Sequence, residues 1–238
     1  MEPRVGVVIV AGGSGLRMGG RVPKQFSFLG QKPMLAHSID LFAKALSNVE
    51  VVVVVAEDRV DYWRNLSARF AVSDHKVVTG GAERFFSVKA GVDALSESVD
   101  VIAVHDGARP LCSAELVQRC VASAVSNGSA IPVVALADSI RERVGVEGSG
   151  GSKAVDRSQF MAVQTPQVFD AAILRRGYKQ SFDASFTDDA SVVERMGESV
   201  WTCDGERGNF KITTQEDMLF AQAYIAHIDS LDRDNYEQ

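Results

Sequence analysis

Short runs of β-branched residues alternate with stretches of helical periodicity along this chain, and this alternation limits the fold more than any other feature. The first run, Val5–Val10, is continuous and apolar, as expected of a strand buried on both faces of a sheet. A strand, a turn and a helix that repeat at least four times predict a single-domain α/β fold with a mostly parallel, doubly wound sheet. The further strands are expected at Val49–Ala56, in HKVVTGG, in VDVIAVHDGARP and at Ser129–Leu136, and the helices between them at Leu35–Leu46, Arg59–Phe70, Phe86–Leu95 and Ser113–Val125.

The last third of the chain is predicted to complete this fold with shorter elements. FMAVQTPQVFD leads into a helix around Ala171–Lys179, and a second helix begins after Thr187 or Asp188, either of which is a plausible N-cap. SVWTCDG is typical of a late strand. A closing helix follows, and the residues after His227 are expected to fray because they are polar.

Composition excludes several classes of protein. A formal net charge of −6 argues against a general nucleic-acid binder, which needs a broad cationic surface. Three scattered cysteines are too few for a disulfide framework, and no pair has metal-ligand spacing. The N-terminal segment lacks a signal-peptide pattern, and the apolar runs are too short to cross a bilayer. We therefore expect a soluble, cytoplasmic protein with no membrane partner.

The alternation of strands and helices is interrupted between Asp138 and Arg157. Polar and apolar residues alternate there on both sides of a Gly/Ser cluster at 145–152, which indicates a hairpin with a flexible tip. A linker between two domains is the alternative, but the sequence beyond Phe160 is too small for a core of its own. We expect residues 137–158 to form a protruding β-arm. Because isolated hairpins are marginally stable, the arm should lie on a second copy of the chain and form a homodimer.

Three turns rich in glycine and charge follow expected strands: Ala11–Lys24, Gly80–Ser87 and His105–Pro110. In open α/β sheets, ligands bind at the carboxyl ends of the strands. We therefore expect these three turns to meet at one edge of the sheet and to form one binding site.

The first turn, AGGSGLRMGGRVPKQF, matches neither of the common phosphate-binding loops. It lacks the Gly-Lys-Ser/Thr end of a Walker A loop, and Gly13-x-Gly15 is followed by Met18 instead of the third glycine of a dinucleotide fingerprint. Its small residues can still point backbone N–H groups at anionic oxygens. The embedded cations Arg17 and Lys24 favour a site where charge builds on phosphorus, as in attack on an α-phosphate with release of pyrophosphate.

The same loop resembles the G-x-G-x-R-M and P-K signature of the sugar-nucleotide-type nucleotidyltransferases. Together with GGAERFFSV, HDGARP, TPQ and GNFKIT, in this order from Val5 to about Ile225, it resembles the methylerythritol phosphate cytidylyltransferase family of the non-mevalonate isoprenoid pathway. The resemblance implies a Rossmann-like nucleotidyltransferase fold. It also implies transfer of CMP from CTP to 2-C-methyl-D-erythritol 4-phosphate, giving 4-diphosphocytidyl-2-C-methyl-D-erythritol and pyrophosphate, with Mg²⁺ bound mainly through the CTP phosphates and no protein metal ligands assigned.

The resemblance also assigns roles on the nucleotide side. Arg17 and Lys24 would be the catalytic cations, and Asp106 would contact CTP or its sugar. The remaining CTP-binding residues would be Ala11, Gly12, Gly13 and Gly15 in the loop and Gly81, Ala82 and Ser87 around the cytosine. The family often has an acidic residue where this chain has Ala82, so a contact there would be made by the backbone. Arg84 is either a member of this pocket or a surface charge at the start of a helix.

For the acceptor, the resemblance points to seven residues, of which Ser139 and Arg157 would reach it across a dimer interface. The family usually has threonine where Ser139 stands, and often an acidic residue near Gly208, which this chain lacks. His105 is expected to be structural, because its side chain points to the opposite face from that of Asp106. The attacking phosphate is itself largely dianionic at neutral pH, so no general base is required. The seven acceptor residues are Asp106, Arg109, Ser139, Arg157, Thr165, Thr187 and Lys211.

Three other functions are alternatives to the methylerythritol phosphate cytidylyltransferase activity that the resemblance implies. A ribitol 5-phosphate cytidylyltransferase would share the fold and most motifs. A nicotinamide-dependent dehydrogenase is opposed by the missing third glycine and by the cations in the loop. In a non-catalytic nucleotide sensor, we would expect those loop cations to have been lost.

Overall fold

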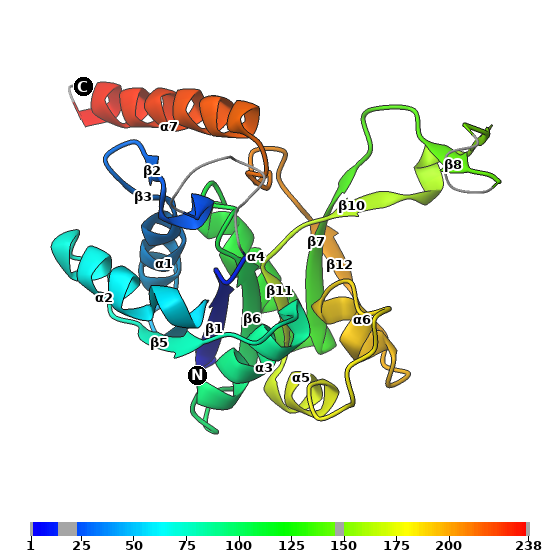
Figure 1. The fold of residues 1–238 in the computed structure, drawn as a ribbon, viewed down its shortest axis with the longest axis horizontal. Coiled ribbons are helices and arrows are strands. Elements are labelled where there is room, and N and C mark those ends of the chain that lie inside the picture. The colour runs from blue at the N-terminus through cyan, green and yellow to red at the C-terminus, as the bar shows by residue number, and fades with distance from the viewer. Residues whose placement is uncertain (1, 14–22, 146–149, 237–238) are drawn as a thin grey trace.

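The computed structural model describes residues 2–13, 23–145 and 150–236. Its centre is an eight-stranded mixed sheet in the order β10-β7-β11-β6-β1-β4-β5, with β12 beside β7 (Figure 1). The first strand, β1, pairs in parallel with both β4 and β6, and β4 pairs in parallel with β5. The strands of this sheet are β1 (Val5–Val10), β4 (Val49–Val55), β5 (Lys76–Thr79), β6 (Val101–Asp106), β7 (Ser129–Ala135), β10 (Met161–Val163), β11 (Gln167–Asp170) and β12 (Thr202–Asp204).

Helices cover both faces of the sheet, which confirms the doubly wound α/β fold. The side chains of β1 alternate between the two faces: Val7 and Ile9 pack into a core with α1, α2 and α4, whereas Val8 packs into a core with α3, α5 and α6. The helices are α1 (Met34–Ala45), α2 (Val60–Arg69), α3 (Arg84–Ala94), α4 (Ala114–Asn127), α5 (Ala171–Gly177) and α6 (Asp189–Glu194).

A long closing helix, α7 (Gln215–Tyr236), lies across the end of the molecule where β1 and β6 finish (Figure 1). Met218 and Ala221 anchor it on a third apolar cluster with Leu29 and Ile212. The helix extends to Tyr236, further than the frayed end expected after His227. Among the described residues, every helix is too short or too polar to span a membrane.

Two strands of the sheet, β10 and β11, were not predicted from the sequence. The segment read as the approach to a helix contains β11, which lies antiparallel between β6 and β7. Asp170 at the end of this strand caps α5 by accepting from the backbone N–H groups of Ala172 and Ile173, so the strand runs directly into the helix and only the helix was predicted. The predicted late strand is confirmed as β12, and Asp188, not Thr187, is the N-cap of α6.

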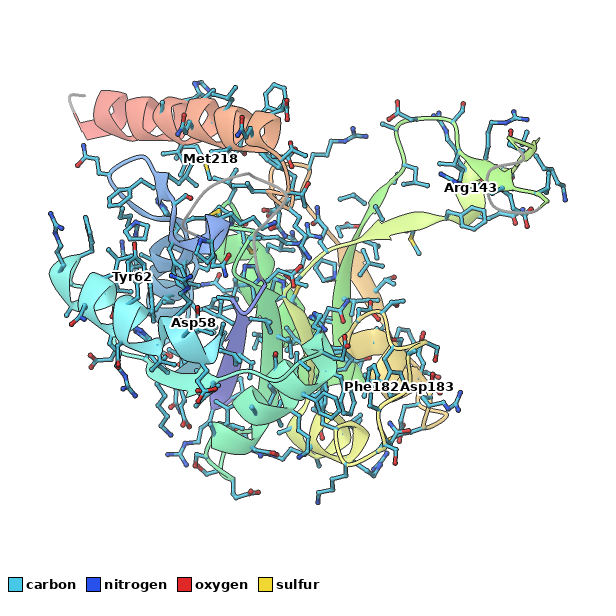
Figure 2. The ribbon with its side chains drawn as sticks, in the orientation of Figure 1. Asp58, Tyr62, Arg143, Phe182, Asp183 and Met218 are labelled. Atoms are coloured by element: carbon cyan, nitrogen blue, oxygen red, sulfur yellow. The ribbon has the colours of Figure 1, made fainter. Side chains whose placement is uncertain are left out.

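The predicted β-arm is present as an antiparallel hairpin of β8 (Arg141–Arg143) and β9 (Ser152–Ala154). β7 leads out to it and β10 leads back into the same sheet, so the segment is not a linker to a second domain. All six residues of its two strands are exposed, and Arg143 lies well away from the body of the protein (Figure 2). Residues 146–149 at its tip lie outside the described residues.

The described residues also form three short 3-10 turns and a small hairpin. They are η2 (Lys24–Phe26), η3 (Glu57–Arg59), η4 (Arg157–Gln159), and the pair β2 (Phe28–Leu29) and β3 (Lys32–Pro33). Of these, η2 matters most for the site, because it carries Lys24 and Gln25.

Candidate functional site

The three glycine-rich turns meet in one cleft at the carboxyl ends of β1 and β6, as predicted. Its volume is about 560 Å³, within the range of small-molecule sites. The described residues that line it are Val10, Ala11, Gly12, Gly13, Lys24, Gln25, Gly81, Ala82, Glu83, Arg84, Ser87, Asp106, Ala108 and Lys211. Two of the predicted residues, Gly15 and Arg17, lie outside the described residues.

The start of the glycine-rich turn is fixed to the sheet. The backbone N–H of Ala11 donates to the Val54 carbonyl at 2.8 Å, so the chain follows β4 for one residue beyond the end of β1. The side-chain amide of Gln25 then donates to the carbonyls of Ala11, at 2.5 Å, and Gly13, at 2.9 Å. The described part of the loop is therefore held from two sides.

Lys24 enters the cleft from η2, and its ammonium donates to the Ile212 carbonyl at 2.7 Å. The next residue but one, Phe26, is buried and stacks on Trp63 with 5.8 Å between ring centroids. This aromatic contact anchors the turn. The position of the lysine is thus set by the core and not by a solvent-exposed loop.

The second turn forms a wall built from close backbone packing. Ser87 is buried, and its hydroxyl accepts from the Gly81 N–H at 3.2 Å. A Cβ at Gly80 would lie 2.7 Å from the Ser87 Oγ, and one at Gly81 would lie 2.3 Å from the Phe86 Cβ, so neither position has room for a side chain. Ala82 contributes only a methyl group to the cleft, so any hydrogen bond from this position must come from its backbone.

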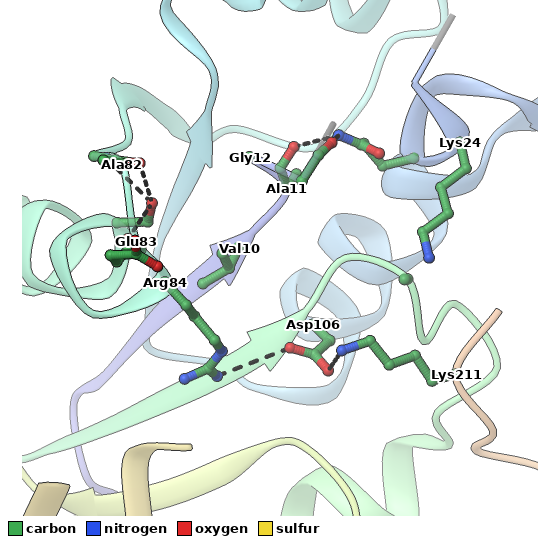
Figure 3. A pocket seen from close by; sticks show the side chains of 14 residues that line it. Val10, Ala11, Gly12, Lys24, Ala82, Glu83, Arg84, Asp106 and Lys211 are labelled. Atoms are coloured by element: carbon green, nitrogen blue, oxygen red, sulfur yellow. Dashed lines mark hydrogen bonds and ion pairs between the residues drawn. The ribbon is translucent and has the colours of Figure 1, made fainter. Parts of the chain in front are cut away.

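Asp106 lines the cleft between the side chains of Arg84 and Lys211 (Figure 3), and Arg109 is a third cation nearby. Its carboxylate is 2.9 Å from the Lys211 Nζ, 3.7 Å from the Arg109 Nε and 3.8 Å from an Arg84 Nη. Burial alone would raise the pKa of Asp106, but the charges of Lys211 and Arg84, with a smaller effect of Arg109, lower it to about 2. The carboxylate is therefore ionised across the physiological range and orients the surrounding cations.

Arg84 belongs to the cleft wall, which settles the alternative left open by its position at a helix start. Its guanidinium forms two parallel hydrogen bonds with the fully buried Asp189, at 3.0 and 2.7 Å. Tyr178 donates its hydroxyl to the same carboxylate at 2.5 Å. Such a fork holds the arginine in one geometry, and the Nη2 that bonds Asp189 also lies 3.8 Å from the Asp106 carboxylate.

His105 points away from the cleft, which confirms its structural interpretation. It is fully buried against Phe42, and burial lowers its pKa to about 4, so the ring is neutral. Its Nε2 lies 3.1 Å from the Arg109 carbonyl, which can only accept. Nε2 therefore carries the proton, and Nδ1 accepts from the Thr165 hydroxyl at 3.1 Å.

Two of the predicted acceptor residues hold backbone instead of facing the cleft. The Thr165 hydroxyl accepts from the Asp106 N–H at 3.0 Å and so fixes the end of β6. Arg109 donates to the Asn209 carbonyl at 2.7 Å and to the Val163 carbonyl at 3.4 Å. The Thr165 carbonyl also accepts from the Asn209 side chain at 2.8 Å, so both residues hold Asn209, two positions before Lys211. Lys211 is the one predicted acceptor residue besides Asp106 that lines the described cleft.

The other three predicted acceptor residues are exposed and lie outside the cleft lining. Thr187 precedes α6, and its backbone N–H donates to the Ser191 hydroxyl at 3.0 Å. Ser139 and Arg157 lie at the base of the β-arm, where Arg157 donates to the Ala137 carbonyl. Within one chain, the two arm residues are therefore not brought to the cleft.

Sequence reasoning missed Gln25 and Glu83 as lining residues. Gln25 lies in the PKQF motif beside Lys24. The structure shows that Gln25 and Phe26 are both buried, but the burial of a glutamine cannot be recognised from the sequence. Among the described residues, no three His, Cys, Asp or Glu side chains gather as a metal-ligand set.

Comparison with known proteins agrees with the chemistry of this cleft. A family described as 2-C-methyl-D-erythritol 4-phosphate cytidylyltransferase matches residues 5–227. Curated relatives of that name include one from Bacteroides fragilis, 42% identical over 92% of this chain and 98% of its own length, and one from Porphyromonas gingivalis, 40% identical over 94% and 99%.

Solved structures agree with the fold. A 4-diphosphocytidyl-2C-methyl-D-erythritol synthase from Anaerococcus prevotii has a TM-score of 0.78 at 27% identity and covers 94% of this chain and 96% of its own. A 2-C-methyl-D-erythritol 4-phosphate cytidylyltransferase from Thermus thermophilus has a TM-score of 0.73 at 30% identity, over 94% and 98%. The chain therefore belongs to the 2-C-methyl-D-erythritol 4-phosphate cytidylyltransferase family.

Proposed function

We propose that this chain transfers CMP from CTP to 2-C-methyl-D-erythritol 4-phosphate in the cleft at the ends of β1 and β6. The observation that carries the proposal is the meeting of three features in one cavity. These are the backbone of residues 11–13, the ammonium of Lys24 and the pair formed by Asp106 and Lys211. Family membership supports the same reaction.

The triphosphate lies along the glycine-rich turn, and Lys24 and Arg17 stabilise the charge that develops on the α-phosphate. An oxygen of the acceptor phosphate attacks the α-phosphorus in line. The bond from the α-phosphorus to the bridging oxygen breaks, and pyrophosphate leaves with that electron pair. Fixed cations aimed at the developing charge are the main means of acceleration in such a reaction.

The proposed mechanism uses no general base. A phosphate monoester has a second pKa near 6, so the acceptor is already largely dianionic at neutral pH. His105 is buried, neutral and engaged at both ring nitrogens, and it does not line the cleft. Lys211, which pairs with Asp106 at 2.9 Å, would receive the acceptor phosphate.

The residues of the cleft fit a Mg²⁺ ion that arrives on the nucleotide. Asp106 is already paired with cations, and the described residues provide no three-ligand set, so the phosphate oxygens of CTP would be the main ligands. When bound, the ion neutralises charge on the triphosphate. Asp106 and Glu83 are the carboxylates among the described lining residues that could contact its water ligands.

We further propose that the β-arm forms a homodimer and completes the acceptor site. Phe160, Met161 and Val163, at the base of the arm, are all exposed, by 47%, 55% and 41%. Covering this apolar strip with a second copy would remove it from water. In such a dimer, Ser139 and Arg157 of the partner subunit would supply a hydroxyl and a cation to the acceptor phosphate. We also propose a cytoplasmic location for the reaction.

A single assay tests the proposed function. Purified protein is incubated with CTP and Mg²⁺, with either 2-C-methyl-D-erythritol 4-phosphate or ribitol 5-phosphate as the acceptor, and pyrophosphate release is measured. We expect release with the methylerythritol compound and loss of that release when EDTA is added. Release with ribitol 5-phosphate alone would assign a different acceptor, and no release with either would refute cytidylyl transfer.

A further inference from the structure

The side chain of Gln25 lines the cleft and makes two hydrogen bonds with the described part of the glycine-rich turn. It is 5% exposed, and its amide nitrogen donates to two backbone carbonyls, those of Ala11 at 2.5 Å and Gly13 at 2.9 Å. A side-chain amide has two N–H donors, so these two bonds use both of them. One buried and one partly buried hydrogen bond from the same side chain, to residues two apart, fix the direction of the intervening backbone.

The direction that Gln25 imposes suits an anion. In a trans peptide, the carbonyl and the following N–H point in opposite directions. With the Ala11 carbonyl turned to Gln25, the N–H of Gly12 points to the other side. Carbonyl oxygens left facing the cleft would repel the oxygens of a triphosphate. A donated hydrogen bond also polarises each peptide group and strengthens its N–H as a donor.

Gln25 also connects the loop to the catalytic lysine. Lys24 and Gln25 are neighbours in η2, and Phe26 anchors this turn in the core by stacking on Trp63. The lysine and the start of the loop therefore share one support. A change that loosens Gln25 would let the loop backbone shift relative to Lys24, without moving Lys24 away from the core.

We propose that Gln25 is a positioning residue for the triphosphate of CTP. It turns two carbonyl oxygens out of the cleft and fixes the spacing between the glycine-rich turn and Lys24. This inference rests on the proposed function, because it assigns Gln25 a part in binding the same nucleotide.

The decisive variant is Gln25→Glu, which keeps the size of the side chain. An ionised carboxylate has no proton to donate and would face two carbonyl oxygens. We expect kcat to fall about 100-fold, as for a misplaced reacting group. We also expect the KM for CTP to rise and the KM for the acceptor to stay within about twofold of the wild-type value. These are measured by pyrophosphate release.

The matched control is Gln180→Glu. The Gln180 amide also donates to two backbone carbonyls, those of Gly177 at 3.0 Å and Val192 at 2.9 Å, in a part of the chain that does not line the cleft. This variant tests the cost of losing two such bonds without touching the loop. We expect its kcat and both KM values to match those of the wild type.

A pH profile separates positioning from a merely structural role. Burial raises the pKa of a carboxyl group, and the protonated carboxyl group of the Gln25→Glu variant can again donate one hydrogen bond. The activity of Gln25→Glu relative to the wild type should therefore rise several-fold between pH 8.5 and pH 6.5, whereas the ratio for Gln180→Glu should stay flat. If Gln25→Glu does not fold, as judged by circular dichroism, Gln25→Met replaces it, with an expected loss of about tenfold in kcat and a higher KM for CTP.

Two results would overturn the proposal: kinetic constants of the folded Gln25 variant within twofold of the wild type, or an acceptor KM that rises as much as the KM for CTP. The wild-type protein, run in the same plates, keeps the two hypotheses apart. Its failure to release pyrophosphate would count against the proposed function. CTP binding by calorimetry would then test Gln25 alone, with a tenfold weaker binding of CTP by Gln25→Glu than by the wild type in support and equal binding against.

Discussion

Replacing Asp106 by asparagine should destabilise the protein by an amount that the structure allows us to estimate. The carboxylate is 13% exposed and lies among Lys211, Arg84 and Arg109. Its pKa is about 2, against an ordinary value of 3.8. At 1.36 kcal/mol for each pKa unit, this difference corresponds to about 2 kcal/mol of stability at neutral pH.

The sign of the pH dependence follows from the lowered pKa. A carboxyl group with a lowered folded-state pKa stabilises the protein above its unfolded-state pKa, and this stabilisation is lost as the pH falls toward the folded-state value. The free energy of unfolding of Asp106→Asn should therefore lie about 2 kcal/mol below that of the wild type at pH 7. The two proteins should converge between about pH 4 and pH 2.

Urea unfolding followed by circular dichroism measures this difference at each pH. Asp93→Asn is the matched control, because Asp93 is 59% exposed and pairs with Lys89 at 2.7 Å on the surface of α3. Such a surface pair contributes about 0.5 kcal/mol or less. A loss for Asp106→Asn no larger than that of the control would refute the view that Asp106 is held ionised by its cations. A difference that stays constant down to pH 3 would refute the linkage.

Three further predictions follow from the site and the arm. Lys24→Ala should lower kcat about 10²- to 10³-fold and leave the melting temperature little changed. The control Lys44→Ala, on the exposed end of α1, should release pyrophosphate at the wild-type rate. A wild-type rate for Lys24→Ala would contradict a catalytic role for Lys24. Burial lowers the pKa of His105 from 6.5 to about 4, so its contribution to stability is complete above pH 6.5 and is lost as the pH falls through about 4. Urea titrations of His105→Gln should then show a shallower loss over this range, and parallel curves would contradict the buried neutral ring. Replacing residues 141–154 by a two-residue Asn-Gly turn should convert a dimer into a monomer in sedimentation velocity. It should also raise the KM for the acceptor more than the KM for CTP. An unchanged dimer would show that the arm does not form the interface.

The parts of the fold that sequence reasoning predicted well are those with a strong period or a strong break. The β-branched run of β1 and the glycines that follow it indicated a buried parallel strand before a binding turn, and the alternation around 145–152 indicated the hairpin. β11 was not predicted because its last residue, Asp170, caps α5, so the segment looks like the start of a helix. Its position between β6 and β7 is decided by tertiary packing, which a local pattern does not contain.

The site could be predicted to the level of its turns but not of its contacts. Lys24 and Asp106 are recognisable from their places in the sequence. Lys24 follows the glycine-rich turn after β1, and Asp106 ends β6 directly before Gly107. The paired hydrogen bonds between Arg84 and Asp189 join residues 105 positions apart, and the sequence around either residue does not predict this contact. Arg109 was predicted to pair with a phosphate, but its two Nη groups donate to the backbone of Asn209 and Val163, which its sequence position alone does not reveal.

The most direct test of the central claim follows the α-phosphate of CTP itself. Wild-type protein in excess over CTP labelled at the α-phosphate is mixed with 2-C-methyl-D-erythritol 4-phosphate and Mg²⁺, and the products are separated after a single turnover. Cytidylyl transfer predicts that the label appears in the diphosphate ester of methylerythritol, with one pyrophosphate released for each product formed. Label found in free CMP, or retained in CTP while the acceptor is unchanged, would contradict the account.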